Sequence, residues 1–69
     1  MKLSIIIPVY NSEKIISLLI KLIYKNLKDK INPFEIILIN DYSRDRSWEK
    51  INYLVKKYSF VKGINLNQN

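Results

Sequence analysis

Two short polar segments, each directly after an apolar run, contain the side chains of this chain best suited to binding a ligand. A nucleobase could stack on the ring of Tyr10, as bases commonly do on aromatic faces. The carboxylate of Asp41 could accept a hydrogen bond from the imide nitrogen of uracil or from the edge of guanine. Asn11 and Ser12 stand where the N-terminus of a helix could face an anion.

Several of these side chains also have a purely structural interpretation. Tyr10 is equally typical of an aromatic residue that packs on the core at a strand end, and Asp41 and Ser43 are equally typical of residues that shape a turn. Asp45 is better explained as the cap of a following helix than as a ligand-binding carboxylate. Trp48 recurs at helical spacing and is expected in the core. For Tyr10 and Asp41 the pattern leaves both interpretations open.

The residue types that are missing exclude several kinds of site. Gly63 is the single glycine of the chain, which excludes a Walker-type phosphate loop and a G-x-G-x-x-G fingerprint. The counts of 0 His and 0 Cys exclude a serine–histidine triad, thiolate chemistry and the usual zinc sites. No Asp-x-Asp pair occurs, so there is no obvious carboxylate clamp for a metal-bound diphosphate. We therefore expect this chain to contain no catalytic residue and no metal site.

The composition is that of a globular protein with a basic surface. Hydrophobic residues make up 48% and charged residues 26%, which excludes a disordered chain. Lys and Arg number 12 against 6 for Asp and Glu, and a net charge of +6 favours phosphates, nucleic acid or anionic lipid. The lysines are scattered, which favours a solvated surface and argues against nucleic acid as a partner. The apolar run at residues 3–9 is too short to span a membrane, and no signal-peptide cleavage site follows it.

The hydrophobic pattern predicts an α/β unit in which strands and helices alternate. Unbroken apolar runs rich in β-branched residues predict strands at residues 3–9, 34–39 and 60–66, the last of them weaker. Apolar residues at helical spacing predict a helix over 13–27 with Asn11 or Ser12 as its cap. A second helix is expected after Asp45.

This order of elements predicts a three-stranded parallel sheet with right-handed crossovers and both helices on one face. Ligands bind at the carboxyl ends of such strands, so the two polar segments should meet there. The strands carry apolar side chains on both faces near residues 5–7 and 36–39. The face without helices therefore needs another cover, and we expect either part of a larger domain or an obligate oligomer.

The two polar segments resemble those of the family-2 glycosyltransferases of GT-A fold. The first pattern of that family is a hydrophobic strand followed by Pro-x-Tyr-Asn, which is Pro8-Val9-Tyr10-Asn11 here. The second is a hydrophobic strand followed by Asp-Asp-x-Ser-x-Asp-x-Ser/Thr, which corresponds to residues 40–47. Residues 61–69 resemble the subgroup that transfers sugars to polyprenyl phosphates. This chain departs from the patterns at three positions. Asn40 stands where the family has Asp, and Tyr42 stands where it has a small residue. Ser12 stands where the subgroup often has Glu.

The resemblance implies that residues 1–69 are an incomplete, N-terminal and nucleotide-binding half of a Rossmann-like GT-A domain. It implies contacts to the donor nucleotide from Pro8, Val9, Tyr10, Asn11, Asp41 and Ser43. The full enzyme would move a sugar from a UDP- or GDP-sugar to a lipid-phosphate or glycan acceptor, with Mg or Mn held by carboxylates further along. The expected location is the cytoplasm, with association at the cytoplasmic face of the membrane.

Two further expectations concern the chain in isolation. Because the family's metal-binding and catalytic carboxylates lie beyond these residues, we expect no sugar transfer from this chain alone. The competing hypothesis is a free-standing, non-catalytic module that binds a nucleotide or a partner and self-associates through its uncovered sheet face.

Overall fold

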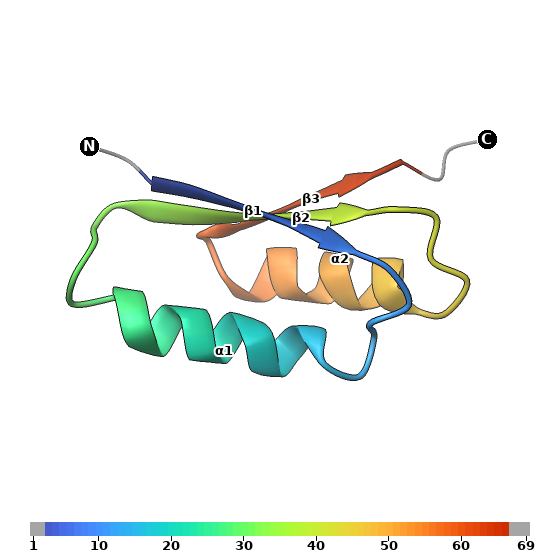
Figure 1. Cartoon of the computed structure of the whole chain (residues 1–69), viewed down its shortest axis with the longest axis horizontal. Coiled ribbons are helices and arrows are strands. Elements are labelled where there is room, and N and C mark those ends of the chain that lie inside the picture. The colour runs from blue at the N-terminus through green and yellow to red at the C-terminus, as the bar shows by residue number, and fades with distance from the viewer. Residues whose placement is uncertain (1–2, 67–69) are drawn as a thin grey trace.

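The computed structural model describes residues 3–66 as a parallel sheet with two helices packed beneath it (Figure 1). The elements follow in the order β1 (Leu3–Val9), α1 (Ile16–Leu27), β2 (Phe34–Asn40), α2 (Ser47–Lys57) and β3 (Val61–Asn65). The strand order is β1-β2-β3, and both pairs are parallel. The predicted α/β fold with alternating strands and helices is confirmed.

The register of the sheet brings the carboxyl ends of all three strands to one level. Val9 lies opposite Asn40, and Asn40 in turn lies opposite Asn65. At the other end β1 and β2 also start level, with Leu3 opposite Phe34. The loops that follow β1 and β2 therefore leave the same edge of the sheet, side by side.

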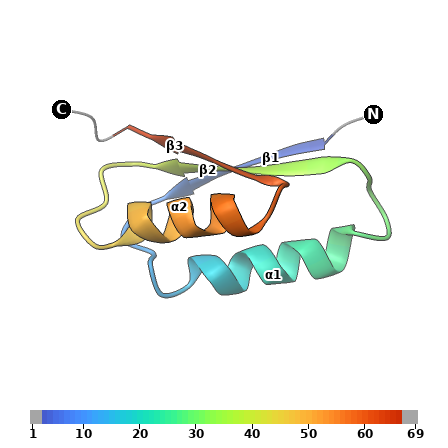
Figure 2. The same ribbon diagram turned by 180° about the vertical axis from the view of Figure 1, so that it is seen from behind.

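The core lies between the sheet and the two helices, which Figures 1 and 2 show on the same face from opposite sides. Its buried members are contributed by all five elements: Val9, Ile16, Ile20, Ile36, Leu38, Ile51, Leu54 and Val61. Each fully buried aliphatic side chain of this size stabilises a fold by about 1.5–3 kcal/mol. Trp48 packs against this core while partly buried, as predicted.

The opposite face of the sheet, called the open face below, is not covered by any element of residues 3–66 (Figure 1). Because side chains alternate along a strand, it consists of Ser4, Ile6, Pro8, Glu35, Ile37, Ile39, Lys62 and Ile64. Ile6 is 62% exposed and Ile64 47%. The sequence-based expectation of an apolar, uncovered face is thus met.

Gly63 allows α2 to approach β3 closely. A Cβ atom at this position would lie 2.6 Å from Cγ2 of Ile51 and 3.4 Å from side-chain atoms of Trp48 and Val55. Ile51 is fully buried, so it has little freedom to move away. The single glycine of the chain therefore sets the distance between this helix and the sheet.

The start of α1 differs from the prediction. The helix begins at Ile16 instead of residue 13, and residues 13–15 form a turn. The carbonyl of Ser12 accepts hydrogen bonds from the N–H groups of Ile15, at 3.1 Å, and Ile16, at 3.2 Å. Neither predicted cap is used, because both side chains are engaged elsewhere. Asn11 Oδ1 accepts a hydrogen bond from the Arg44 N–H, and the Ser12 hydroxyl donates to the carbonyl of Tyr10.

The remaining boundaries differ by one residue. The second strand extends to Asn40 rather than ending at residue 39, and the third occupies Val61–Asn65 rather than residues 60–66. Within residues 3–66 neither helix has the length and apolar character needed to cross a membrane.

Candidate functional site

The loops after β1 and β2 are joined along their whole length at the carboxyl edge of the sheet. The Asp41 N–H donates to the carbonyl of Val9 over 2.9 Å, which continues the ladder of the sheet beyond the last paired residues. One step further, the Asn11 N–H donates to Oγ of Ser43 over 3.0 Å. The predicted meeting of the two polar segments is therefore observed.

Three consecutive N–H groups of the first loop donate to side chains of the second loop or of the start of α2. The acceptors are Ser43 Oγ for Asn11, Ser47 Oγ for Ser12 at 2.8 Å, and Asp45 Oδ2 for Glu13 at 3.2 Å. These backbone donors are therefore already used within the protein. The hypothesis that Asn11 and Ser12 face an anion from a helix N-terminus is wrong, because α1 begins only at Ile16.

The pairing is reciprocal. The Arg44 N–H donates to Oδ1 of Asn11 over 2.7 Å, and the Arg46 N–H donates to Oε1 of Glu13 over 3.3 Å. Each loop thus satisfies backbone donors of the other. The N–H groups of Asn11, Ser12 and Glu13 take part in partly buried bonds and are costly to leave unpaired, so the bonds of the first loop fix the two loops relative to each other.

Asp45 has a structural role at the start of α2, although the N-cap position is Arg46 and not Asp45 as predicted. Its carboxylate accepts hydrogen bonds from the N–H and hydroxyl of Ser47, the first residue of α2, and from the N–H of Glu13. Partial desolvation acts to raise the pKa of Asp45, but the hydrogen bonds from Ser47 and Glu13 outweigh it and lower the pKa below its usual value. The carboxylate is ionised at neutral pH and ties the first loop to the start of α2.

A cavity of about 650 Å³ opens between the two loops, and we call it the loop cavity. It is lined by Tyr10, Tyr42, Ser43 and Arg44. Tyr10 is 58% exposed and Tyr42 59%, so neither ring packs in the core. The alternative in which Tyr10 is a core residue is therefore wrong.

Tyr42 is a cavity residue that the sequence analysis did not identify. Its φ of 57° lies in the left-handed region, as does the φ of 46° at Asn11. Asparagine is tolerated there, whereas a bulky residue such as tyrosine is strained. The signal available in the sequence was the presence of a large ring where the family pattern has a small residue.

The other predicted residues occupy different surroundings. Ser43 is buried, lines the loop cavity, and contacts the carbonyl of Val9 at 3.4 Å. Val9 itself is a core residue with 2% exposure, and Pro8 lies on the open face opposite Ile39. Asp41 is exposed beside the cavity and is not one of its lining residues. The structure thus brings together Tyr10, Asn11 and Ser43, and places Asp41 at their margin.

Asn40 explains one departure from the family pattern. Its side chain is buried at the end of β2, and Nδ2 donates a hydrogen bond to Oδ1 of Asn65 over 2.9 Å. An aspartate has no such donor. The asparagine at this position therefore connects β2 to the end of β3.

Within the part of the chain that the structure describes, no three Asp, Glu, His or Cys side chains lie close enough to hold a metal ion. This edge of the sheet presents two aromatic faces, a hydroxyl, a guanidinium and, beside them, a carboxylate. Ligands of parallel α/β sheets bind at this edge.

Comparison with known proteins places this arrangement in a family. The model of the protein family described as "Glycosyl transferase family 2" matches residues 4–69. The chain belongs to the family-2 glycosyltransferases, and the resemblance seen in the two polar segments is confirmed.

Two relatives show the same relationship. The chain is 43% identical over 61 residues to a poly(ribitol-phosphate) beta-glucosyltransferase of Bacillus spizizenii. The matched residues make up 88% of this chain and 10% of that relative. It is 41% identical over 58 residues to a dolichol-phosphate mannosyltransferase of Pyrococcus furiosus, covering 84% of this chain and 16% of the relative. The chain thus spans 10–16% of the length of these two relatives.

Proposed function

We propose that the loop cavity binds the nucleotide of a nucleotide-diphosphate sugar, and that the full protein transfers the sugar to an acceptor. The observation that supports this most is the pair of exposed rings, Tyr10 and Tyr42, that line one cavity at the carboxyl edge of a parallel sheet. Aromatic rings offer faces on which a nucleobase can stack, and two of them border this one cavity.

In this proposal each lining group has a distinct task. A base stacks on the ring of Tyr10 or Tyr42, and the exposed carboxylate of Asp41 accepts a hydrogen bond from the base edge. The guanidinium of Arg44 is suited to an oxygen of the diphosphate. The hydrogen bonds between the loops keep these groups in place before the ligand arrives, which lowers the entropic cost of binding.

The remaining steps of transfer are proposed for groups outside residues 3–66. A divalent metal, Mg or Mn, would neutralise the leaving diphosphate, and carboxylates elsewhere in the full protein would hold it. The names of both relatives contain a phosphate-bearing compound, poly(ribitol-phosphate) or dolichol-phosphate. We therefore propose a phosphate-bearing polymer or a polyprenyl phosphate as acceptor, used at the cytoplasmic face of the membrane in building the cell envelope.

The test is a titration of the ¹⁵N-labelled chain with UDP and with GDP, followed by two-dimensional NMR. We expect saturable shifts of amides in residues 10–13 and 41–46. Tyr10→Ala should weaken binding by about tenfold, since stacking of one base is worth about 1–3 kcal/mol. Tyr24→Ala is the control, because it removes a partly exposed ring (43%) from α1, outside the loop cavity. Saturable binding of neither nucleotide at these amides would overturn the proposal.

A second candidate is the non-catalytic, self-associating module. The open face supports it, because Ile6, Ile37, Ile39 and Ile64 form an apolar group with no cover in residues 3–66. A module of this kind would bind UDP or GDP as an oligomer of one defined mass, whereas part of a larger domain would associate without a defined mass. Measuring molar mass with and without nucleotide therefore separates the two candidates.

A further inference from the structure

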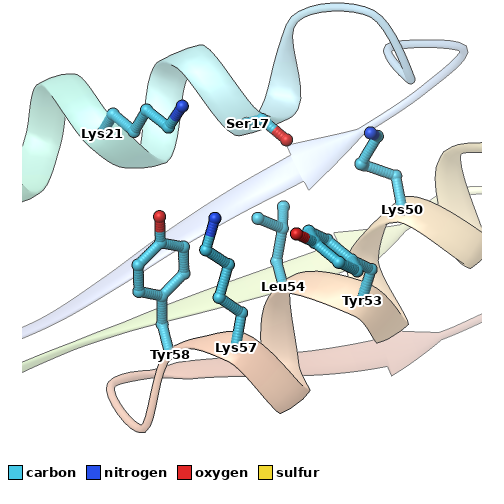
Figure 3. Close-up of a pocket in the computed structure, with 7 residues that line it drawn as sticks. All are labelled: Ser17, Lys21, Lys50, Tyr53, Leu54, Lys57 and Tyr58. Carbon is cyan, nitrogen blue, oxygen red and sulfur yellow. The ribbon is translucent and has the colours of Figure 1, made fainter.

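A second concave site lies between the two helices, on the far side of the core from the open face (Figure 3). This helix groove has a volume of about 240 Å³. Its lining comes from α1, from α2 and from the residue after α2: Ser17, Lys21, Lys50, Tyr53, Leu54, Lys57 and Tyr58. It has no lining residue in common with the loop cavity.

The groove is lined by cations and hydroxyls and by no carboxylate. Lys21 belongs to α1, whereas Lys50 and Lys57 belong to α2, and Figure 3 shows Lys57 directed from α2 toward α1. Hydroxyl donors are available from Ser17 and from the two tyrosines. Within residues 3–66 none of the three lysines forms an ion pair, whereas Lys62 on the open face pairs with Glu35.

Two of the lysines are held in position by aromatic rings. The ammonium of Lys57 lies 5.7 Å from the ring centre of Tyr53 and 5.4 Å from that of Tyr58. Lys50 lies 5.7 Å from the ring centre of Tyr53. Electrostatic attraction to Tyr53 and then Tyr58 raises the pKa of Lys57 above its usual value, so this group is fully charged at neutral pH.

The lysines are exposed or partly exposed, but they are not scattered at this place. Here cations from both helices line one groove and leave their repulsion uncompensated by any lining carboxylate. Ammonium groups with nearby hydroxyl donors are the groups that bind phosphate oxygens.

We propose that the helix groove is a binding site for a phosphorylated ligand, separate from the loop cavity. A phosphate or diphosphate group lies between α1 and α2 and accepts hydrogen bonds from Lys21, Lys50 and Lys57. Its source is either a soluble phosphorylated compound or an anionic lipid headgroup, and the phosphate chemistry is the same in both.

Inorganic pyrophosphate is the probe, titrated into the ¹⁵N-labelled chain at low salt. We expect saturable amide shifts centred on the lining of the helix groove. The triple variant Lys21→Gln, Lys50→Gln and Lys57→Gln should weaken binding by about tenfold or more, since it removes three charged hydrogen-bond donors from the groove. Two-dimensional NMR of each variant checks whether the fold is retained.

The matched control is Lys25→Gln, Lys28→Gln and Lys56→Gln. These lysines lie at exposed positions outside the groove, two of them on α1 or directly after it and one on α2, so the control removes the same charge. We expect it to retain pyrophosphate affinity within about threefold, which a general dependence on net charge does not allow. Equal losses in both triple variants, or shifts centred on residues 10–13 and 41–46, would overturn the proposal.

A second arm identifies the source of the phosphate. Flotation with phosphatidylglycerol vesicles and with neutral phosphatidylcholine vesicles is compared for the wild type and both triple variants. Retention on phosphatidylglycerol that only the groove variant loses assigns a lipid headgroup. Saturable pyrophosphate binding without vesicle retention assigns a soluble ligand, and absence of both refutes the site.

Discussion

Tyr42 combines a strained backbone with an exposed ring. A residue other than glycine in the left-handed region costs about 1 kcal/mol or more, and Tyr42 has a φ of 57°. Its ring gains little compensation from packing, because it is 59% exposed and lines the loop cavity. Strain of this kind is typically retained where a side chain serves a ligand.

The first prediction separates the strain at position 42 from the role of the ring. Tyr42→Gly relieves the strain but adds flexibility to the unfolded chain, so the free energy of unfolding should change by no more than about 1 kcal/mol. The affinity for UDP or GDP should fall by about tenfold, because one aromatic wall of the cavity is lost. Urea unfolding and NMR titration measure the two effects.

Tyr42→Ala is the matched variant. It also removes the ring but keeps a Cβ atom in the left-handed region, so it should bind nucleotide as weakly as Tyr42→Gly and be less stable by about 1 kcal/mol. Wild-type nucleotide affinity in both variants would show that the ring has no part in binding.

The sequence was sufficient to predict Tyr10, Asn11 and Ser43 as neighbours, because strand ends in a parallel sheet share an edge. It was not sufficient to predict which backbone N–H groups of the loops remain available to a ligand. The N–H groups of Asn11, Ser12 and Glu13 are used by side chains 32–35 residues away, and no local pattern reports a bond of that separation. The predicted start of α1 is three residues too early, because these distant bonds hold residues 11–13 outside the helix.

The elements themselves were predictable to within one residue at most boundaries, because apolar periodicity and β-branched runs depend on nearby residues only. The distance between α2 and β3 could not be predicted in this way. It depends on a single contact, in which the missing side chain of Gly63 leaves room for Ile51.

The element-scale prediction therefore concerns this contact. Gly63→Ala should lower the free energy of unfolding by about 1–3 kcal/mol, because the added methyl overlaps Cγ2 of a fully buried isoleucine. Urea unfolding measures the loss. The double variant Gly63→Ala with Ile51→Leu removes the overlapping atom and should recover part of the stability; no recovery would assign the loss to another cause.

For the molecule as a whole, the open face is an apolar sheet surface that no element of residues 3–66 covers. Apolar patches of this kind rarely stay in contact with water in soluble monomers. The chain in isolation should therefore associate as its concentration rises, and sedimentation or light scattering would record the change in mass.

A double substitution on the open face tests this expectation. Ile6→Lys with Ile64→Lys places charges at positions that are 62% and 47% exposed, so the fold should retain its stability while the association is suppressed. The matched control is Ile15→Lys with Leu22→Lys, which adds the same charge at positions that are 60% and 48% exposed but lie outside the open face. Undiminished association of the double variant would locate the contact elsewhere on the surface.

The reciprocal bonds between the two loops have a consequence for any attempt to exchange specificity between relatives. Each loop supplies the acceptors for the backbone of the other, with Ser43, Asp45 and Ser47 on one side and Asn11 and Glu13 on the other. A segment imported alone keeps these bonds only where it carries the same acceptor side chains at these positions. The two segments form a single structural unit, so an exchange of binding specificity should move both together.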